Sequence, residues 1–320
     1  MPFREYIKVS TDLITPYAQT RAGFLKIALE KNQQASPFVA EAKALKTIAL
    51  RAKNAKALLS MPLIASALLT ASGLSTKALT HLTEDDKQEA INNLVIQFLE
   101  PAGVEFVDEL VFRFLLTRGD SLGGKMRNLA GKIAEKTLLR TIVATLSIQN
   151  QPFQWYDAYS KKWMIGNKND PHIETRSKGL SWHSNNQDRT LLLNLTVPLV
   201  GKNVDLCLLN ASPKEIVRRG KQPSRHRDPS YYIALGELKG GIDPAGADEH
   251  WKTANSALNR IRNSFWQESL KPNIFFIGAA IENAMSEEIF AQLQAGELAN
   301  AANLTDEAQL FALADWLCRL

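Results

Sequence analysis

Two segments in the second half of the chain are predicted to be strands with two apolar faces. They are VDLCLLN at 204–210 and YYIALGELKGG at 231–241, in which hydrophobic residues fill odd and even positions alike. Successive side chains of a strand point to opposite faces of its sheet, so both faces of these strands must be covered by other parts of the protein. The chain therefore has to build a sheet that lies between packed layers.

Further short apolar runs, bounded by Gly, Pro and Asn, predict the rest of this sheet. Strands are expected near 189–200 and 273–281, beside those near 204–210 and 230–239. A helix is expected over 248–268, where apolar residues recur along one face. These residues are Trp251, Ala254, Leu258, Ile261 and Phe265. The order strand, strand, strand, helix, strand, helix, helix predicts the α/β (α+β) fold class, a sheet with flanking helices.

The first 150 residues differ from the rest of the chain in composition and sequence pattern, and they are predicted to be helical. None of the six tryptophans lies there. The clearest helix starts after Thr83, which has capping-box spacing to Asp86, and ends before Pro101. A second is predicted over 107–115, where Val, Leu and Phe recur at helical spacing. Weaker helical patterns cover 12–32, 36–53 and 125–147.

This contrast predicts two domains, mainly helical over 1–150 and sheet-based over 151–320. The net charge of +5 lies in the first, which has 19 basic and 14 acidic residues, whereas the second has 19 of each. A basic balance permits a polyanionic partner without proving one. Within the second domain, residues 213–228 are rich in Lys and Arg, and this stretch is either a solvated loop or a contact to phosphate.

Composition excludes several classes of protein. With 45% hydrophobic and 22% charged residues, the chain is typical of folded proteins and not of disordered or low-complexity ones. Two cysteines, Cys207 and Cys318, are too few for a disulfide framework and suit a reducing cytosol. The most apolar stretch, 58–73, is too short and interrupted to span a membrane, and the N-terminus lacks the apolar core of a secretory signal. We therefore expect a cytoplasmic protein.

Three charged residues interrupt the two-sided strands: Asp205, Glu237 and Lys239. Burying an unpaired charge is costly, so such residues must pair with each other or with a metal ion. Glu237 and Lys239 project from the same face, and Asp205 can reach them from the adjacent strand. Two carboxylates suit Mg²⁺, with a phosphate completing its ligands, while the lysine can orient a water or stabilise developing negative charge. The cluster predicts metal-dependent phosphodiester hydrolysis, with a structural ion pair as the alternative.

Four segments of the chain carry a family resemblance. They are GELKGGIDPAGADEHWKTANSALNRIR at 236–262, GDSLGGKMRN at 119–128, LTEDDKQEAINNL at 82–94 and EFVDEL at 105–110. All four resemble the AvaI/BsoBI type II restriction endonucleases, which belong to the PD-(D/E)xK nuclease superfamily, and the likeness extends over most of the chain. It implies a restriction-endonuclease-like mixed sheet with flanking helices as the catalytic domain, and a helical N-terminal domain that binds DNA.

The resemblance also implies an activity. It is the Mg²⁺-dependent hydrolysis of phosphodiester bonds in double-stranded DNA, by a homodimer, at the palindrome CYCGRG, leaving 5′ overhangs. No nucleotide cofactor is implied. A cognate DNA methyltransferase is implied in the same prokaryotic cell, although not as a bound subunit.

The same resemblance implies roles for individual catalytic residues. Asp205, Glu237 and Lys239 match the catalytic triad of the family, with Asp205 and Glu237 as metal ligands. His250 matches a histidine that assists the attacking water, and a helix-capping or DNA-contacting histidine is its alternative. One position departs from the family pattern, because Val204 stands where the superfamily motif has proline. That proline is not a metal ligand, so the chemistry is unaffected.

DNA contacts follow partly from the resemblance and partly from charge. Lys77 and Asp243 match base-reading positions, since a lysine suits guanine O6 and N7 and a carboxylate suits cytosine N4. Lys125 and Arg127, at a Gly-rich helix start, and Lys202, close before Asp205, are predicted phosphate contacts. Solvated surface residues are the alternative for Lys77 and Asp243.

Competing functions have weaker support in the sequence. Residues 119–125 nearly match a nucleotide-binding P-loop, but Met126 stands where a Ser or Thr must follow the lysine, and the segment before it has a helical pattern. The five histidines and two cysteines lack zinc-ligand spacing, and no G-x-S-x-G serine hydrolase motif is present. A DNA-binding protein without catalysis remains the main alternative, although carboxylates that face phosphate would repel DNA unless a cation intervenes.

Overall fold

The structure, a computed structural model, describes residues 2–126, 128–216 and 223–320, without the side chain of Lys125. Within these residues the chain forms two compact units. The sheet unit contains Met1–Phe24 and Ala130–Leu320, and the helical unit contains Leu25–Leu129. No helix in the described parts of the chain combines the length and the apolar character that crossing a membrane requires.

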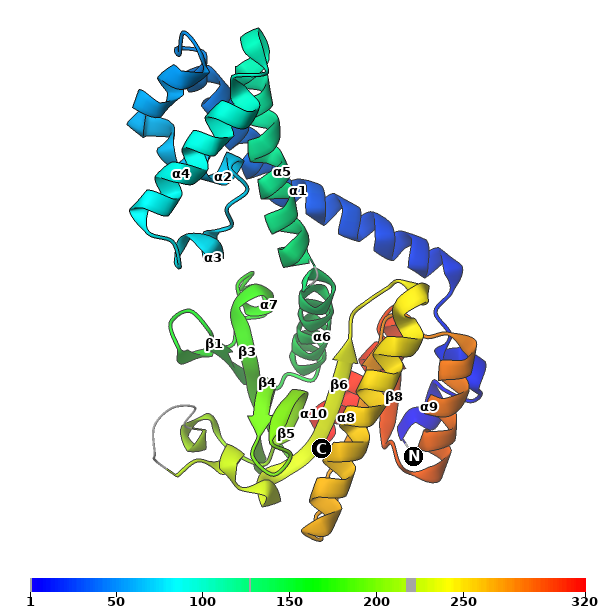
Figure 1. Cartoon of the computed structure of the whole chain (residues 1–320). Coiled ribbons are helices and arrows are strands. Elements are labelled where there is room, and N and C mark those ends of the chain that lie inside the picture. The colour runs from blue at the N-terminus through cyan, green and yellow to red at the C-terminus, as the bar shows by residue number, and fades with distance from the viewer. Residues whose placement is uncertain (1, 127, 217–222) are drawn as a thin grey trace. The chain divides into compact units, whose positions relative to one another are not determined.

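In the described residues, eight strands form one sheet within the sheet unit (Figure 1). Their order is β2-β1-β3-β4-β5-β6-β7-β8, antiparallel as far as β6 and parallel for the last two pairs. The strands are β1 (Phe153–Asp157), β2 (Lys162–Ile165), β3 (Ser177–Ser184), β4 (Gln187–Val197), β5 (Lys202–Leu209), β6 (Tyr232–Lys239), β7 (Asn273–Gly278) and β8 (Asn300–Asn303). This mixed sheet confirms the predicted α/β (α+β) class.

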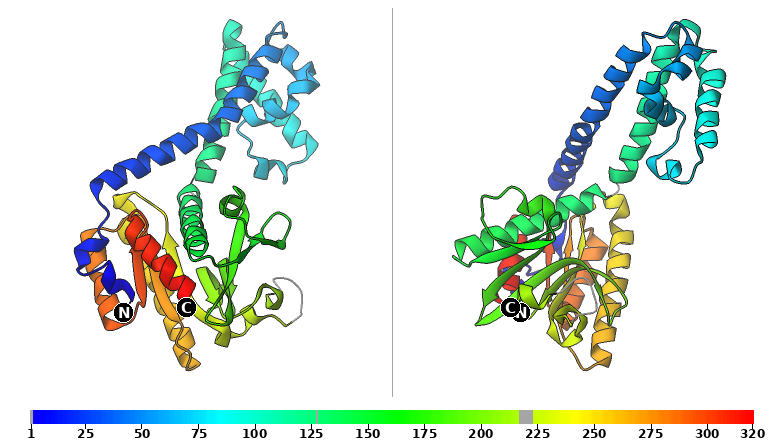
Figure 2. Two further views of the ribbon diagram at one scale, coloured as in Figure 1. Left: turned by 180° about the vertical axis from the view of Figure 1, so that it is seen from behind. Right: turned by 90° about the vertical axis from the view of Figure 1, so that its left-hand side faces the viewer.

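Helices cover both faces of the sheet, as the two-sided strands predicted. α8 (Ala247–Gln267) and α9 (Asn283–Ala295) pack on one face, and α6 (Leu129–Ile148) and α10 (Glu307–Arg319) pack on the other. Figure 1 shows α8 in front of the sheet, and the left view of Figure 2, from behind, shows α10 in front. Apolar strand residues at odd and even positions are therefore both buried. Each Å² of apolar surface that is buried stabilises the folded protein by about 25 cal/mol.

The N-terminal segment belongs to the sheet unit, although the helical unit follows it in the sequence. Ile7 and Leu13 are buried in the same core as α8 and α9. The Thr15 hydroxyl donates to the Ala279 carbonyl at 2.8 Å, and the Asn303 side chain donates to the Leu13 carbonyl at 2.9 Å. The sheet unit is therefore built from two separate stretches of the chain.

The helical unit has its own apolar core. Its helices are α1 (Tyr17–Ala49), which begins in the sheet unit, α2 (Ala65–Ala71), α3 (Thr76–Leu79), α4 (Glu84–Leu94) and α5 (Phe106–Met126). The predicted capping box is confirmed: the Thr83 hydroxyl accepts from the Asp86 amide at 3.2 Å, and the Asp86 carboxylate accepts from the Thr83 amide at 2.8 Å. A π-helical turn at Val95–Leu99 continues α4 to the predicted end before Pro101.

Two predicted boundaries differ from the structure. The helices expected at 12–32 and 36–53 are one helix, α1, which contains Pro37. Pro37 is exposed, so the carbonyl that loses its helical partner can bond to water instead. The compact units divide at Phe24/Leu25 and Leu129/Ala130 rather than at 150, because α6 buries one side against the sheet.

Four strands of the sheet were not predicted: β1, β2, β3 and β8. The sequence of β8 is NAAN, which has no β-branched or aromatic residue, and it forms a strand because it extends the parallel edge beside β7. β1 to β3 carry Trp155 and Trp182 in the core on α6, yet their polar residues hide the alternation. The predicted helix at 248–268 and the four predicted strands are confirmed within a few residues.

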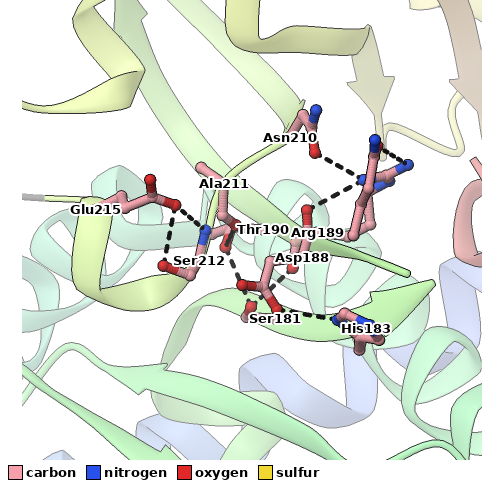
Figure 3. Close-up of polar contacts among 10 residues, drawn as sticks. Ser181, His183, Asp188, Arg189, Thr190, Asn210, Ala211, Ser212 and Glu215 are labelled. Carbon is pink, nitrogen blue, oxygen red and sulfur yellow. Dashed lines mark hydrogen bonds and ion pairs between the residues drawn. The ribbon is translucent and has the colours of Figure 1, made fainter. Parts of the chain in front are cut away.

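Side-chain hydrogen bonds secure the sheet where β5 ends and the basic stretch at 213–228 begins (Figure 3). The Thr190 hydroxyl donates to the Ala211 carbonyl at 2.7 Å, and buried Arg189 donates to the Asn210 side chain at 2.8 Å. The Glu215 carboxylate then accepts from the Ser212 amide at 2.9 Å, closing a short turn. These contacts have a structural role, because they satisfy polar groups that the end of the strand buries.

Candidate active site

The central strands separate at the position of the predicted catalytic cluster. The β5–β6 ladder ends with the pair Leu206–Gly236. Asp205 and Glu237 are the next residues on their respective strands, so their carboxylates lie where the two strands diverge. The backbone amide of Leu238, which has no β5 carbonyl to bond there, donates instead to the Asp205 carboxylate at 2.9 Å. The fork in the sheet thus directs one acidic side chain from each strand toward the same place.

Lys239 joins the two carboxylates. Its ammonium donates to Glu237 at 2.7 Å and to Asp205 at 3.2 Å. Glu237 and Lys239 reach each other because they are two residues apart on β6 and share a face. The structure therefore brings together the three residues that the sequence selected as the catalytic cluster.

Asn194 on β4 lies opposite Asp205 and was not predicted to matter. It has a positive φ of 52°, which is uncommon outside glycine, and the recorded strand pairing skips it and Asp205. The flanking pairs are Leu193–Leu206, in the core with α6 and α10, and Leu195–Val204, in the core with α8 and α9. In both strands the regular alternation of side chains between the two faces of the sheet is therefore interrupted at this point. Asp205 lies at the interruption.

Burial and mutual repulsion set the charges of the cluster. Glu237 is 4% exposed, and its pKa is raised to about 7 by burial and by the negative charge of Asp205, against the opposing effect of Lys239. Burial lowers the pKa of Lys239, but the charges of Asp205 and Glu237 outweigh it, so the net shift is upward. With both acids ionised, two negative charges share one positive charge, and the cluster remains net negative.

This donor set fits a magnesium ion. Hard carboxylate oxygens are the protein ligands that Mg²⁺ prefers, and it commonly takes one or two of them, with waters and a substrate phosphate for the rest. An added cation would also relieve the repulsion that raises the pKa of Glu237. In the described part of the chain, no group of three or more His, Cys, Asp or Glu side chains is placed to hold a metal ion, and Asp205 and Glu237 as metal ligands remain a prediction.

His250 lies in the first turn of α8, beyond the loop that follows β6. The next residue, Trp251, is buried, contacts Phe276 edge-to-face and donates through its indole to Glu288 at 2.6 Å, which fixes this turn of the helix. The His250 imidazole lies over Gly241, two residues after Lys239, since a Cβ built on Gly241 would be 2.9 Å from Nε2. The histidine is exposed, as a residue that meets water or DNA must be.

The predicted DNA contacts have different settings. Lys202 is exposed at the start of β5, three residues before Asp205. Asp243 is exposed and caps the turn η10 (Pro244–Gly246) by accepting from the Ala245 amide at 3.0 Å, so one of its oxygens has a structural partner. Lys77 is exposed on α3 in the helical unit. Their contacts to bases and phosphates remain predictions.

Other predicted contacts fall at the limits of the described residues. Arg127 and the side chain of Lys125 lie outside them, as do residues 217–222 of the basic stretch. The backbone of 119–125 is part of helix α5, so the near-match to a P-loop forms no phosphate-binding loop. The backbone of residue 125, which was predicted to lie at a helix start, is in the last turn of α5 instead.

Two residues of the site escaped prediction although the sequence contains signals for them. Asn194 interrupts the apolar run LLLNLTV, a polar residue where a two-sided strand should have none. Gly236 precedes Glu237 within β6, and a Cβ there would be 2.5 Å from the ring of Phe275. A glycine inside a strand indicates such a close approach, so both signals could have identified the neighbours of the cluster.

Comparison with known proteins agrees with this geometry. The family described as "Restriction endonuclease BsobI" matches residues 3–320. The chain is 54% identical over 322 residues to the type II restriction enzyme BsoBI of Geobacillus stearothermophilus, covering 100% of this chain and 98% of the relative. It is 51% identical over 320 residues to the type II restriction enzyme AvaI of a Nostoc species, covering 100% of both. The resemblance predicted from the four sequence segments is confirmed.

Proposed function

The chain belongs to the BsobI family of restriction endonucleases and is thus a type II site-specific endonuclease, and on that premise we propose its substrate and cofactor. It hydrolyses phosphodiester bonds of double-stranded DNA at the palindrome CYCGRG, leaves 5′ overhangs and requires Mg²⁺. The observation that carries the metal-dependent hydrolysis is the fork between β5 and β6, where Asp205 and Glu237 share the Lys239 ammonium at 3.2 and 2.7 Å. The recognised palindrome and the overhangs are proposed from the resemblance to the AvaI and BsoBI enzymes.

Asp205 and Glu237 would hold the metal, because they supply two convergent carboxylates and a surplus of negative charge. The chemistry that Mg²⁺ supplies when bound is polarisation of the phosphoryl oxygen and a lower pKa for water. Both ligands are held by the fold, Asp205 by the Leu238 amide and Glu237 by burial. The ionised form of Glu237, which burial disfavours, is the form that such a site uses.

Lys239 and His250 act on the water and the phosphate. The Lys239 ammonium stabilises negative charge that develops on the phosphate oxygens, and it orients the attacking water. His250 accepts a proton from that water at an imidazole nitrogen, a role that histidine commonly performs in catalysis. The exposure of His250 at the start of α8 leaves it accessible to substrate.

Recognition of a palindrome accounts for the proposed assembly. One cluster cuts one strand, whereas a palindrome presents two symmetry-related phosphates, so a two-fold homodimer with one cluster in each subunit cuts both strands. Asp243 reads cytosine N4 and Lys77 reads guanine, while Lys125, Arg127 and Lys202 bind phosphates. The enzyme works in the cytoplasm of a prokaryotic cell that also contains a cognate DNA methyltransferase.

A cleavage assay on DNA of known sequence tests the proposal. We expect cutting at CYCGRG with Mg²⁺ and none without it. Asp205→Ala and Glu237→Ala should abolish cleavage yet bind the site as well as the wild type or better, because fewer carboxylates then repel the phosphate. Cleavage by either variant at near the wild-type rate would overturn the metal-ligand assignment.

Specificity and assembly have separate tests. Asp243→Ala should weaken discrimination at a single base-pair position by about 1 to 3 kcal/mol, measured on a library of sites varied at each position. Lys202→Ala should weaken binding to all sequences alike and flatten its salt dependence. Sedimentation should give a species of about twice 35.6 kDa, and a monomer both free and on DNA would contradict the homodimer.

A further inference from the structure

We propose that Gly241 is a positioning residue for His250, and that its missing side chain provides the space in which the imidazole lies. This inference rests on the proposed function, which gives His250 its role toward the attacking water. The observation is steric. A Cβ built on Gly241 would be 2.9 Å from Nε2 and 3.1 Å from Cδ2 of His250, both shorter than ordinary non-bonded contacts.

The backbone on either side of Gly241 cannot move away from the ring. Gly240 lies against the start of α6, where a Cβ on it would be 2.3 Å from the Ala130 carbonyl oxygen. Ile242 is buried, and a Cβ on Gly23 of α1 would be 2.4 Å from its side chain. Since both neighbours of Gly241 are packed this closely, the loop after β6 is fixed in place.

The backbone of His250 is fixed as well. Trp251 anchors this turn of α8 through its contact with Phe276 and its hydrogen bond to Glu288. A methyl group at 241 therefore has one element that can yield to it, the exposed imidazole, which can rotate about its side-chain bonds. The substitution Gly241→Ala should displace the ring and leave the fold intact.

Two other glycines provide comparisons, and one of them, Gly246, is a matched control. Gly246 faces the same imidazole, but a Cβ there would be 3.5 Å from Nε2, an ordinary van der Waals contact. Neither Gly241 nor Gly246 has a positive φ, so alanine meets no backbone strain at either position. Gly240→Ala, in contrast, would place its Cβ against backbone and should destabilise the protein itself.

The experiment compares Gly241→Ala, Gly246→Ala, His250→Ala and the double variant Gly241→Ala/His250→Ala. Single-turnover cleavage is measured with the enzyme in excess over DNA and with saturating Mg²⁺, and DNA affinity is measured without Mg²⁺. We expect Gly241→Ala to slow cleavage about 10- to 100-fold, since a misplaced proton acceptor loses most of its effect, with unchanged affinity and melting temperature. Gly246→Ala should stay within about threefold of the wild type, and the double variant should be no slower than His250→Ala.

The double variant separates positioning from a general structural effect. If Gly241→Ala slows the His250→Ala enzyme by the same factor as the wild type, Gly241 does not act through His250 and the proposal is overturned. A wild-type cleavage rate for Gly241→Ala also overturns it.

A measurement that does not depend on activity separates the proposed positioning role of Gly241 from the proposed catalytic role of His250. The imidazole NMR signals of His250, assigned by their absence in His250→Ala, should shift in Gly241→Ala and stay in place in Gly246→Ala. If His250→Ala itself cuts at the wild-type rate, the catalytic role in the proposed function fails. The proposal that Gly241 positions the imidazole is then tested by these NMR signals alone. Unchanged signals in Gly241→Ala would overturn it.

Discussion

Two buried carboxylates of the sheet unit have nearly the same exposure and opposite electrostatics. Asp157 at the end of β1 is 2% exposed, and Glu237 on β6 is 4% exposed. Asp157 bonds the Arg176 guanidinium through both its oxygens and also accepts from the amides of Tyr159 and Ser160. Glu237 shares the single ammonium of Lys239 with a second carboxylate, Asp205.

The pKa shifts record this difference. Hydrogen bonds, chiefly from Arg176, hold the pKa of Asp157 well below its ordinary value in spite of burial. Burial and the charge of Asp205 raise the pKa of Glu237 to about 7. Burial alone therefore does not distinguish a structural ion pair from a catalytic cluster. The distinction lies in whether the neighbours satisfy the charge or leave it in excess.

The largest expected effect is on the cleavage rate, and it distinguishes Lys239 from Arg176. Lys239→Ala should slow cleavage by about 10²- to 10³-fold, because it removes the ammonium that the two carboxylates share and that, in the proposed function, stabilises charge on the phosphate. Arg176→Ala should cleave at the wild-type rate once corrected for folded protein, since its ion pair is with Asp157. Single-turnover cleavage measures both, and a Lys239→Ala enzyme within tenfold of the wild type would remove the contrast.

The two carboxylates should respond to neutralisation with opposite signs. Asp157→Asn should lower the free energy of unfolding by about 2 kcal/mol, because Arg176 and two amides lose a charged acceptor. Glu237→Gln should raise it by about 1 to 3 kcal/mol at pH 8 without metal, because the buried excess charge is gone. Urea unfolding measures both, with Asp188→Asn, in an exposed pair with His183, as a control near zero. Changes of the same sign would refute the comparison.

The pH dependence of stability should differ in the same way. Since the pKa of Glu237 is raised in the folded state, the folded protein binds a proton more tightly than the unfolded chain, and stability falls as pH rises from about 4.5 to 7. Asp157 has a lowered pKa, so its contribution is present above about pH 4 and is lost below it. The stability gain of Glu237→Gln should therefore grow between pH 4.5 and 7 and level off above. A gain independent of pH would mean that Glu237 does not titrate in this range.

The smallest expected effect concerns the backbone of Asn194, where the pairing of β4 with β5 is interrupted opposite Asp205. Asn194→Ala should destabilise the protein by about 1 kcal/mol more than Asn194→Gly, because alanine is strained at a φ of 52° and glycine is not. Both variants remove the hydrogen bond from Asn194 to Glu135, so their difference isolates the backbone. Urea midpoints give the difference, and equal midpoints would show that the left-handed conformation costs nothing.

The charged cluster of the site was predictable because charge in a two-sided strand is conspicuous. Asp205, Glu237 and Lys239 stood out against apolar neighbours, and the period of a strand placed two of them on one face. The fork between β5 and β6 was not predictable, since the point where their ladder ends is not marked by a local pattern, and neither is the left-handed conformation of Asn194 on the other side of β5. The proximity of His250 to Gly241 likewise depends on how α8 returns to the sheet.

Elements with strong local patterns were predicted, and elements that depend on tertiary partners were not. α4, α5 and α8 have helical periodicity; the predicted positions of α4 and α8 are confirmed, and α5 begins where predicted but continues to Met126. β8 forms from NAAN because β7 offers it a parallel edge, which is information from elsewhere in the chain. The position of α6 shows the same limit, because its periodicity predicted a helix without indicating that it would cover the sheet.

The participation of the N-terminal segment in the sheet unit has a consequence for synthesis on the ribosome. Thr15 and Leu13 are synthesised 288 and 290 residues before Asn303, which donates to both. The helical unit is complete long before that and can fold while translation continues, because it has a core of its own. Its early folding would shorten the path between the two stretches of the sheet unit, and so lower the entropic cost of bringing them together. Nascent nuclease should accordingly remain inactive until Asn303 has left the ribosome, a delay that separates synthesis of the helical unit from the first opportunity to cut DNA.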